Sequence, residues 1–271
     1  GDVYKRQTRE MGCSAKGEKG CYAREPCRIA ARSTAAIASE CPHGIGQQTI
    51  DGLNSKMMKQ IRLKSVVPHV FSSCADLKSD VWNQDVTLEK GKTYLVEAHS
   101  GRGKSTFCSY LIGYRQDYTG ELLFDDTPTT TFSMQQWVDV RRSGISHLFQ
   151  ELRLFPELSA HDNVMIKNSL THHVTPSQVN QWFEMLGISD KLDTPIANMS
   201  FGQQQRVALM RALAQPFDFL VADEPISHLD DDNAAVMASL MMEEAHRQGA
   251  GVIVTSIGKH MDLDYDKVFC L

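Results

Sequence analysis

The hydrophobic positions in the first part of the patterned region follow the spacings of strands and of one helix. Apolar and polar residues alternate over residues 61–67 (IRLKSVV), which predicts a strand. Residues 81–98 (VWNQDVTLEKGKTYLVEA) contain two further strand patterns, separated by a turn at Lys90 and Gly91. Residues 105–114 (STFCSYLIGY) then carry apolar side chains at helical spacing. The predicted order is therefore three strands followed by a helix.

The second half of the chain alternates helical patterns with continuous apolar runs. Residues 179–188 (VNQWFEMLGI) and 198–215 (NMSFGQQQRVALMRALAQ) have the spacing of amphipathic helices. Residues 219–222 and 251–255 are short apolar runs, typical of strands buried in a parallel sheet. This mixture of buried strands and amphipathic helices predicts an α/β fold.

Residues 1–56 show neither the helical nor the strand periodicity of hydrophobic residues over a useful length, which favours a disordered or non-native leader. Residues 1–7 contain DVYKRQ, which looks like the translation of a sequencing-library adapter. We therefore keep this segment out of the functional argument and expect Met57 or Met58 to be the natural start. The domain predicted to carry the function is residues 57–271.

The cysteines do not predict a metal site or a disulfide framework. Four of the seven lie in the leader, spaced C-x7-C-x5-C-x13-C (Cys13, Cys21, Cys27 and Cys41). Zinc ligands usually come in close C-x2–4-C pairs, so this spacing argues against zinc even with His43 nearby. The other three (Cys74, Cys108 and Cys270) are scattered, and we expect buried or free thiols in a reducing compartment.

Charge argues against nucleic-acid binding, and hydropathy argues against a membrane-spanning or secreted chain. The net charge is −5, and residues 57–271 alone hold 19 basic against 27 acidic side chains, so no nucleic-acid partner is expected. No apolar run reaches the roughly 18 residues of a membrane span, and the polar opening residues do not resemble a secretory signal.

Residues 97–106 (EAHSGRGKST) approach the phosphate-binding pattern G-x-x-x-x-G-K-[ST] and lie between a predicted strand and a predicted helix. Gly101 and Gly103 let backbone N–H groups wrap a phosphate without Cβ atoms in the way. Lys104 is expected to neutralise the phosphates, and the Ser105 hydroxyl to bind Mg²⁺. Ala98 stands where the pattern has its first glycine, which is tolerable if its φ stays negative. The alternative is a chance match.

Residues 217–225 (FDFLVADEP) supply a second half for such a site. The apolar run ends in Asp223 and Glu224, followed by Pro225. A carboxylate at the end of a buried strand can hold Mg²⁺ through its water shell, and an adjacent one can activate the attacking water. Taken alone, this segment is equally consistent with a surface turn.

Residues 198–215 decide the family that the sequence resembles. The pattern L-S-G-G-Q followed by Q-R-V is the signature of ATP-binding-cassette (ABC) ATPases, and residues 199–203 here read Met-Ser-Phe-Gly-Gln. A capped amphipathic helix would explain the apolar positions of this segment but not its Ser-x-Gly-Gln-x-Gln-Arg order. The resemblance covers essentially all of residues 57–271. Within the family, the sequence loosely resembles the branch that serves lipoprotein-release, cell-division and macrolide-efflux complexes.

The resemblance implies a P-loop NTPase fold with a RecA-like core, an antiparallel β subdomain and a helical subdomain over about residues 151–199. It implies ATP and Mg²⁺ as cofactors, a head-to-tail dimer or paired ABC subunit, and a separate transmembrane permease. This chain would then be a cytoplasmic protein, peripheral on the cytoplasmic face of the inner membrane. The residues that it places around the phosphates are Ala98, His99, Ser100, Gly101, Arg102, Gly103, Lys104, Ser105 and Thr106.

The same resemblance assigns the remaining roles. Gln150 would sense Mg²⁺ and the attacking water, and Ser105, Gln150 and Asp223 would be the metal ligands. Phe71, expected on a strand, is the candidate for stacking on adenine. The opposite subunit would contribute the signature residues (Ser200, Gly202 and Gln203) and the residue that ends the SHLD motif (Asp230).

The sequence departs from the family at its γ-phosphate histidine. The family places that histidine after the strand at 251–255, and here Ser256 follows Thr255. A serine hydroxyl offers weaker charge stabilisation, and the loss of one oriented donor can cost about 10²–10³ in turnover. His260 is an alternative donor but is expected past the strand end. Phe201 also replaces the first glycine of the signature pair.

These observations predict an ATP-hydrolysing subunit of an ABC transporter, with Glu224, Gln150 and Ser256 as its catalytic residues. Two alternatives remain: a low-turnover nucleotide-binding regulatory module, suggested by Ser256, and a soluble non-transport ABC ATPase. The second lacks support because neither a second cassette nor a long coiled-coil insertion is present.

Overall fold

The computed structural model describes residues 57–73, 77–99 and 101–271. All of these residues belong to one of the two units into which the chain divides, residues 54–271. The predictions for residues 1–56, Cys74 and Ser100 lie outside the described residues.

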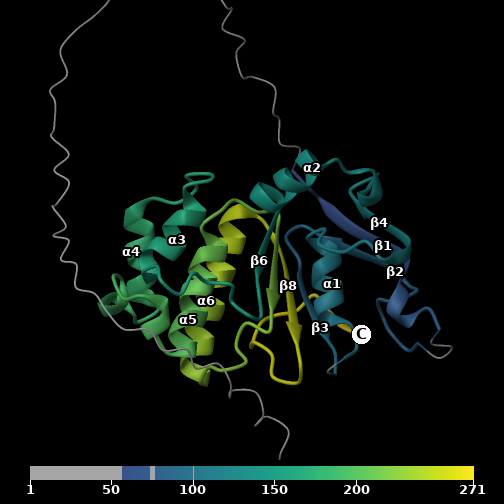
Figure 1. Ribbon diagram of the computed structural model, residues 1–271. Coiled ribbons are helices and arrows are strands. Elements are labelled where there is room, and N and C mark those ends of the chain that lie inside the picture. The colour runs from purple at the N-terminus through teal and green to yellow at the C-terminus, as the bar shows by residue number, and fades with distance from the viewer. Residues whose placement is uncertain (1–56, 74–76, 100) are drawn as a thin grey trace, which may run out of the picture. The chain divides into compact units, whose positions relative to one another are not determined.

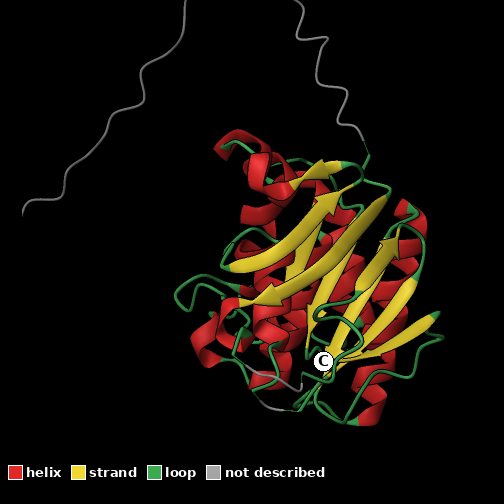
Figure 2. Cartoon of the chain, turned by 90° about the vertical axis from the view of Figure 1, so that its right-hand side faces the viewer, coloured by secondary structure: helices red, strands yellow, loops and turns green. Residues whose placement is uncertain are grey.

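An antiparallel sheet forms one layer of the fold (Figure 2). Its order is β2-β1-β4-β5, and the strands are β1 (Gln60–Pro68), β2 (Asp85–Glu89), β4 (Tyr118–Phe124) and β5 (Thr127–Pro128). Ile61 of β1 pairs with Leu88 on one side and Phe124 on the other, and all three side chains are buried. The period-two pattern of residues 61–67 therefore correctly predicted a strand with one buried face.

A five-stranded parallel sheet, ordered β6-β7-β8-β3-β9, forms the second layer. Its strands are β3 (Thr93–Glu97), β6 (Ile145–Leu148), β7 (Phe219–Asp223), β8 (Gly251–Ser256) and β9 (Lys267–Cys270). The turn at Lys90 and Gly91 leads from β2 in the first sheet to β3 in the second. Because parallel strands end at the same edge, the ends of β3, β7 and β8 bring Glu97, Asp223 and Ser256 to one side of the sheet.

The helices pack on the two faces of the parallel sheet (Figure 1). They are α1 (Lys104–Leu111), α2 (Met134–Asp139), α3 (Ala160–Asn168), α4 (Pro176–Met185), α5 (Phe201–Leu213) and α6 (Asp231–Gln248). Short helical turns join them: η1 (His69–Phe71), η2 (Thr129–Thr131), η3 (Val140–Gly144), η4 (Ser189–Lys191) and η5 (Ile196–Asn198). Residues 151–199, the predicted helical subdomain, contain α3, α4, η4 and η5.

Two hydrophobic cores meet at the parallel sheet because its strands bury both faces. Along β7, Leu220 and Ala222 face the core made with α3, α4, α5 and α6, whereas Phe219 and Val221 face the core shared with α1 and the antiparallel sheet. This double burial explains why residues 219–222 read as a continuous apolar run.

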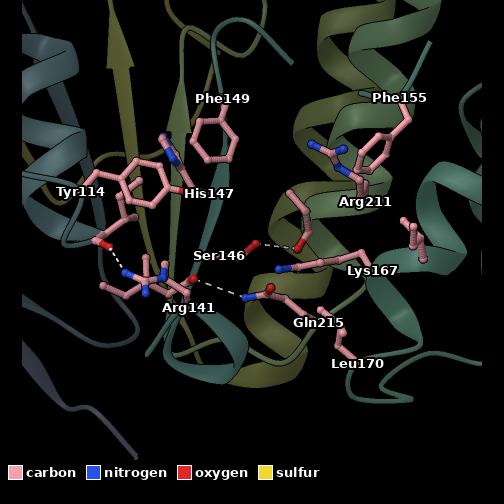
Figure 3. A pocket seen from close by; sticks show the side chains of 14 residues that line it. Tyr114, Arg141, Ser146, His147, Phe149, Phe155, Lys167, Leu170, Arg211 and Gln215 are labelled. Atoms are coloured by element: carbon pink, nitrogen blue, oxygen red, sulfur yellow. Dashed lines mark hydrogen bonds between the residues drawn. The ribbon is translucent and has the colours of Figure 1, made fainter. Parts of the chain in front are cut away.

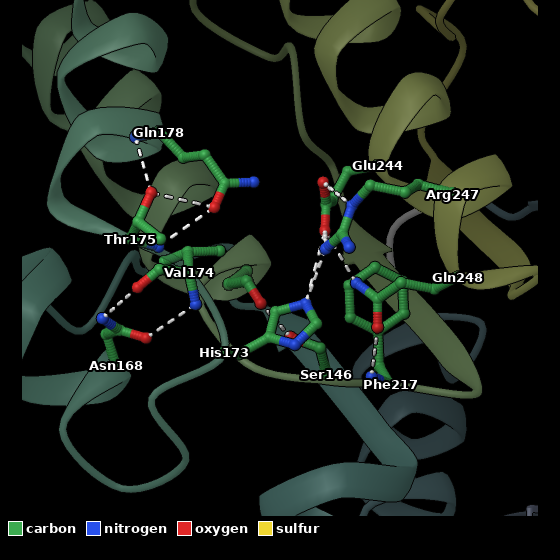
Figure 4. A network of polar contacts seen from close by, with 11 residues as sticks. Ser146, Asn168, His173, Val174, Thr175, Gln178, Phe217, Glu244, Arg247 and Gln248 are labelled. Atoms are coloured by element: carbon green, nitrogen blue, oxygen red, sulfur yellow. Dashed lines mark hydrogen bonds and ion pairs between the residues drawn. The ribbon is translucent and has the colours of Figure 1, made fainter.

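A polar network ties α6 to the segment between α3 and α4 (Figure 4). The Glu244 side chain is buried and accepts hydrogen bonds from Arg247 and from Gln248 Nε2, the latter at 2.9 Å. His173 Nε2 lies 2.8 Å from Arg247 and 3.4 Å from Glu244 Oε1. Burial opposes ionisation of Glu244, but its hydrogen bonds from His173 and Arg247 lower its pKa overall.

Within the described ranges, no helix has both the length and the apolar character needed to cross a membrane.

Candidate functional site

The glycine-rich segment connects β3 to α1, as its sequence predicted. Gly101 and Gly103 have φ values of +81° and +99°, a region that side chains with a Cβ rarely adopt. At Gly103 a Cβ would also lie 2.9 Å from Cε2 of Phe71, so glycine is required there on two grounds. Ala98 is buried and is not among the residues with positive φ, so the alanine fits this turn without left-handed strain.

Lys104 and Glu224 form an ion pair at the centre of the site. The ammonium group contacts Glu224 Oε1, and the two side chains are 7% and 11% exposed. Glu224 also has a φ of +49°, which is strained for a residue with a Cβ and is typical of functional positions. A hydrogen bond from the Glu224 N–H to Thr255 O, at 3.2 Å, helps to hold this conformation.

Asp223 ends β7 and is 5% exposed. Burial raises the pKa of its carboxyl group, although the hydrogen bond from Thr255 and the nearby Lys104 charge oppose this rise. Thr255 Oγ1 donates to Asp223 Oδ1 at 2.5 Å from the adjacent strand β8, which fixes the carboxylate orientation.

A cavity of about 360 Å³ collects half of the predicted site residues, while Ala98, Arg102 and Asp223 are not in its lining. Its lining is Val70, Phe71, His99, Gly101, Gly103, Lys104, Ser105, Thr106, Arg115, Gln150, Glu224 and Ile257. Arg115 was missed because it lies past the helix that the phosphate pattern predicts, where the sequence carries no motif. Its guanidinium bonds Asp117 and donates to Thr106 Oγ1 at 3.2 Å, so it adds a cation beside the loop. Val70 and Ile257 were also missed, since isolated apolar residues give no signal of a site.

Phe71 lies on η1, the short turn after β1, and not on the strand that we expected. Its ring packs over Gly103 and is part of the cavity lining. The strand ends at Pro68, because proline fixes φ and lacks the N–H needed to continue the ladder.

The signature residues lie apart from this cavity, at the start of α5. Ser200 is the N-cap: its hydroxyl accepts from the Gln203 N–H at 3.3 Å, and Gln203 Oε1 accepts from the Ser200 N–H at 2.9 Å. Phe201 is 42% exposed, and its ring lies 4.5 Å from the His228 ring. Gly202 packs against Leu229. The cavity lining contains none of these residues, nor Asp230.

Asp230 is the N-cap of α6, where its carboxylate accepts from the Asn233 N–H at 2.8 Å. Arg206 of α5 donates to Asn233 Oδ1 at 2.9 Å, which joins the signature helix to the start of α6. Gln205 donates to Pro225 O at 3.0 Å and so joins the same helix to the turn after Glu224.

The segment after Gln150 is also held by α5. Leu152 and Arg153 both have positive φ, at +57° and +50°. Arg211 donates to their carbonyl oxygens at 2.9 and 2.7 Å. These bonds stabilise two consecutive strained residues next to the cavity.

A second cavity, of about 340 Å³, opens beside this segment, between β6 and the helices α3 and α5 (Figure 3). Tyr114, His147 and Phe149 lie on one wall, and Phe155 and Arg211 on the other. Burial lowers the pKa of His147 to about 4, so its ring is neutral at neutral pH.

Ser256 is the last residue of β8 and is 1% exposed. Its hydroxyl donates to Lys259 O at 2.5 Å, while the next residue, Ile257, faces the cavity. His260 lies past the strand, with Nδ1 3.6 Å from Glu97 Oε1, and is not part of the lining.

A parallel sheet that ends in a glycine-rich loop, a lysine and paired carboxylates defines a P-loop ATPase. Residues 81–227 match the ABC transporter family. The chain belongs to this family, as an ATP-binding and ATP-hydrolysing cassette.

Individual relatives agree with this assignment. The chain is 31% identical over 185 residues to YclH of Bacillus subtilis, an uncharacterized ABC transporter ATP-binding protein, covering 66% of this chain and 80% of YclH. It is 30% identical over 176 residues to the lipoprotein-releasing ATP-binding protein LolD of Idiomarina loihiensis, covering 64% and 77%. For the methionine import protein MetN of Haemophilus ducreyi, the match spans about half of the relative, 51%.

The fold matches solved cassettes as well. The dimeric bacterial ABC transporter cassette MJ0796 superposes with a TM-score of 0.62 at 24% identity, over 72% of this chain and 87% of that one. The predicted fold class, including the parallel core and the antiparallel sheet, is thereby confirmed.

Proposed function

We propose that this chain hydrolyses Mg²⁺-bound ATP at a site that a second cassette completes, and that it thereby drives a separate membrane permease from the cytoplasmic face. One observation carries this proposal. Lys104, Ser105, Gln150 and Glu224 surround a single cavity, whereas the signature residues lie elsewhere on the same chain.

Lys104 must change partner when the nucleotide binds. Its charge is neutralised by Glu224 in this structure. The ATP phosphates would replace that carboxylate, while the N–H groups of the loop and of the start of α1 donate to the same phosphate oxygens. Phe71, above Gly103, provides the aromatic face for adenine.

The proposed metal ligands suit Mg²⁺. Ser105, Gln150 and Asp223 offer a hydroxyl, an amide oxygen and a carboxylate, which are the hard oxygen donors that Mg²⁺ prefers. The cation would neutralise charge that develops on the phosphates. Thr255 holds Asp223 in one orientation for this role through its 2.5 Å hydrogen bond.

Glu224 would act as the general base once Lys104 has moved to the phosphates. Its carboxylate would then accept a proton from the attacking water, which the exposed Gln150 would orient across the cavity. The positive φ of Glu224 directs this side chain away from the course of β7 and toward Lys104.

The second cassette would supply Ser200, Gly202, Gln203 and Asp230 to this site. In one protomer the helix start at Ser200 is exposed and pre-organised by its capping box. An exposed helix N-terminus binds anions, and the γ-phosphate of a partner-bound nucleotide fits that preference.

The second cavity, between β6 and the helices α3 and α5, is the surface that we assign to the permease (Figure 3). Its apolar rim includes Phe155, Ile166 and Leu170, each about half exposed, and Arg141, Lys167 and Arg211 add positive charge. These features fit a permease segment that carries apolar side chains for the rim and acidic side chains for the three cations. Among the relatives, MacB of Shewanella is described as a combined ATP-binding/permease protein, 27% identical over 190 residues.

A turnover assay tests the proposal directly. The purified chain is compared with Glu224→Gln for phosphate release and for ATP binding. We expect the variant to bind ATP and to lose at least about 10² in turnover, because it lacks a general base. Equal turnover in the two proteins would refute the assignment of Glu224 and the enzymatic function with it.

A second candidate function is a low-turnover nucleotide switch, and the burial of Ser256 favours it. The hydroxyl that stands in for the γ-phosphate histidine already donates to a backbone carbonyl. In that case ATP would still bind, but hydrolysis would be slow for lack of one donor.

A further inference from the structure

His147 is a half-buried residue whose two ring nitrogens are buried, and nucleotide binding does not explain its position. It lies on β6 between Ser146, which bonds to α5, and Leu148, which packs in the core. Among the described residues, both of its ring nitrogens are inaccessible to solvent and have no hydrogen-bond partner. An apolar side chain at this position would avoid the cost of an unsatisfied donor and acceptor, about 1–3 kcal/mol, so the imidazole calls for a partner.

Two potential ligands lie beside the ring. Cys108 of α1 and Asp223 of β7 offer a sulfur and a carboxylate oxygen, and the three ligand atoms all lie within 4.8 Å of one another. The elements that carry them are packed together: β6 pairs with β7, and α1 covers the same face of the sheet. Cys108 is 1% exposed, and within the part of the chain that the structure describes it forms no disulfide.

We propose that Cys108, His147 and Asp223 bind a divalent transition-metal ion of the Zn²⁺ type, and that this ion competes with Mg²⁺ for Asp223. A thiolate, an imidazole and a carboxylate are zinc ligands, whereas Mg²⁺ does not select sulfur. Three protein ligands with an open fourth position make a regulatory or catalytic type of zinc site.

The geometry requires a small adjustment. Zinc–ligand bonds of about 2.0–2.3 Å place tetrahedral ligand atoms about 3.3–3.8 Å apart, so the cluster must contract by up to about 1.5 Å. As the metal–sulfur bond forms, the Cys108 thiol releases its proton to solvent, and no electron is transferred. The ring nitrogen that faces the cluster binds through its lone pair, with the proton on the other nitrogen.

The second cavity provides an access path. His147 lines that cavity between Tyr114 and Phe149, so a rotation of its ring exposes a nitrogen to an ion that enters from the surface and not through the nucleotide site (Figure 3).

The consequence for ATP hydrolysis rests on the proposed function. Asp223 would hold Mg²⁺ in the active site, and a carboxylate drawn toward Cys108 and His147 is no longer oriented for that ion. Bound zinc would therefore inhibit turnover from a position behind the nucleotide, and a permease segment in the second cavity would close the access path.

Cobalt(II) titration of the full chain tests the site without relying on activity, because thiolate-bound Co²⁺ has a charge-transfer absorption. The native chain is compared with Cys108→Ala and His147→Val. The matched controls, Cys270→Ala and His246→Ala, remove exposed residues of the same types. We expect each ligand variant to lose one equivalent of Co²⁺ or to bind it more than about 10–100-fold more weakly. Substitution of residues that only contact a metal ligand weakens metal binding by about 10–100-fold, so loss of a ligand itself should exceed that range.

Equal cobalt binding and equal absorption in the native chain and both ligand variants would overturn the proposal. Cooperative thermal unfolding shows whether each variant is folded. If Cys108→Ala does not fold, Cys108→Ser takes its place. In the turnover assay with excess Mg²⁺, Zn²⁺ should inhibit the native chain and not His147→Val. A native chain without turnover would refute the proposed function, while the cobalt result would still decide the metal site.

Discussion

Adjacent carboxylates at the end of β7 have opposite environments. Asp223 is buried and oriented by Thr255, whereas Glu224 turns out of the strand through a positive φ and pairs with Lys104. One backbone position therefore separates a group suited to hold a cation from a group suited to accept a proton.

At the residue scale, Ser256→His tests whether the missing imidazole limits turnover. We expect turnover to rise by about 10²-fold, because the ring restores an oriented donor near the cavity that Ile257 already reaches. Phosphate release at saturating Mg²⁺-ATP measures the effect. The control Ser256→Ala removes only the bond to Lys259 O, and we expect it to leave turnover unchanged. A fall with Ser256→Ala and no rise with Ser256→His would contradict this explanation.

The sequence predicts those site residues that belong to a continuous motif, and it does not predict contacts between distant parts of the chain. Lys104 and Ser105 follow from one continuous motif, and Asp223 and Glu224 from another. The ion pair between Lys104 and Glu224 joins residues 120 positions apart, so no local pattern contains it. Arg115 and the orphaned ring of His147 were missed for the same reason: their roles depend on neighbours that only the folded chain brings near.

At the scale of elements, α5 acts as a brace between the signature and the segment after Gln150. Its N-terminus carries Ser200, and its C-terminal turn holds the strained carbonyls of Leu152 and Arg153 through Arg211. A movement of this helix therefore reaches both regions.

Arg211→Ala should lower turnover several-fold and leave ATP affinity nearly unchanged, because it releases the Gln150 segment but not the phosphate loop. Phosphate release and nucleotide titration separate the two effects. Arg142→Ala is a matched control, since Arg142 also donates to a backbone carbonyl, that of Leu170, but lies away from this segment. Equal losses of turnover in both variants would argue against a specific brace.

The network around Glu244 predicts a pH dependence of stability. The pKa of Glu244 is lowered in the folded state, so its contribution is present above the unfolded pKa and is lost as pH falls through the folded value. Glu244→Gln should lower the free energy of unfolding by about 1–3 kcal/mol at neutral pH, and by less in acid. Urea unfolding at several pH values measures this, with exposed Glu243→Gln as the control. A difference that does not vary with pH would rule out the ionic contribution.

Element boundaries were predicted less well than element types. The helix predicted over 179–188 spans Pro176–Met185, because a capping box at Thr175 and Gln178 starts it earlier than its first apolar residue suggests. The expected strand position of Phe71 was wrong because Pro68 ends β1 three residues before it. Local side-chain hydrogen bonds and proline geometry decide such ends, and hydrophobic periodicity does not record them.

At the scale of the whole molecule, the match to the ABC transporter family covers residues 81–227 and so lies outside residues 1–56. Among the described residues, the lining of the nucleotide cavity begins at Val70. The likeness to the solved cassette MJ0796 covers 72% of this chain.

Removal of residues 1–56 should therefore leave ATP binding intact and shift the melting temperature by no more than a few degrees. Nucleotide titration and thermal unfolding of the 57–271 fragment, beside the full chain, measure both. A fragment that fails to fold, or that binds ATP more than about tenfold more weakly, would show that the first segment belongs to the functional domain.

The Glu224 carboxylate contacts the Lys104 ammonium group, so it competes with the phosphates of a nucleotide for the same cation. Because this carboxylate is part of the same chain, its effective concentration near Lys104 is high. Glu224→Gln should consequently bind both ATP and ADP more tightly than the native chain. The measured nucleotide affinity then reports an exchange of one anion for another, and a weak affinity would not mean a poorly formed pocket.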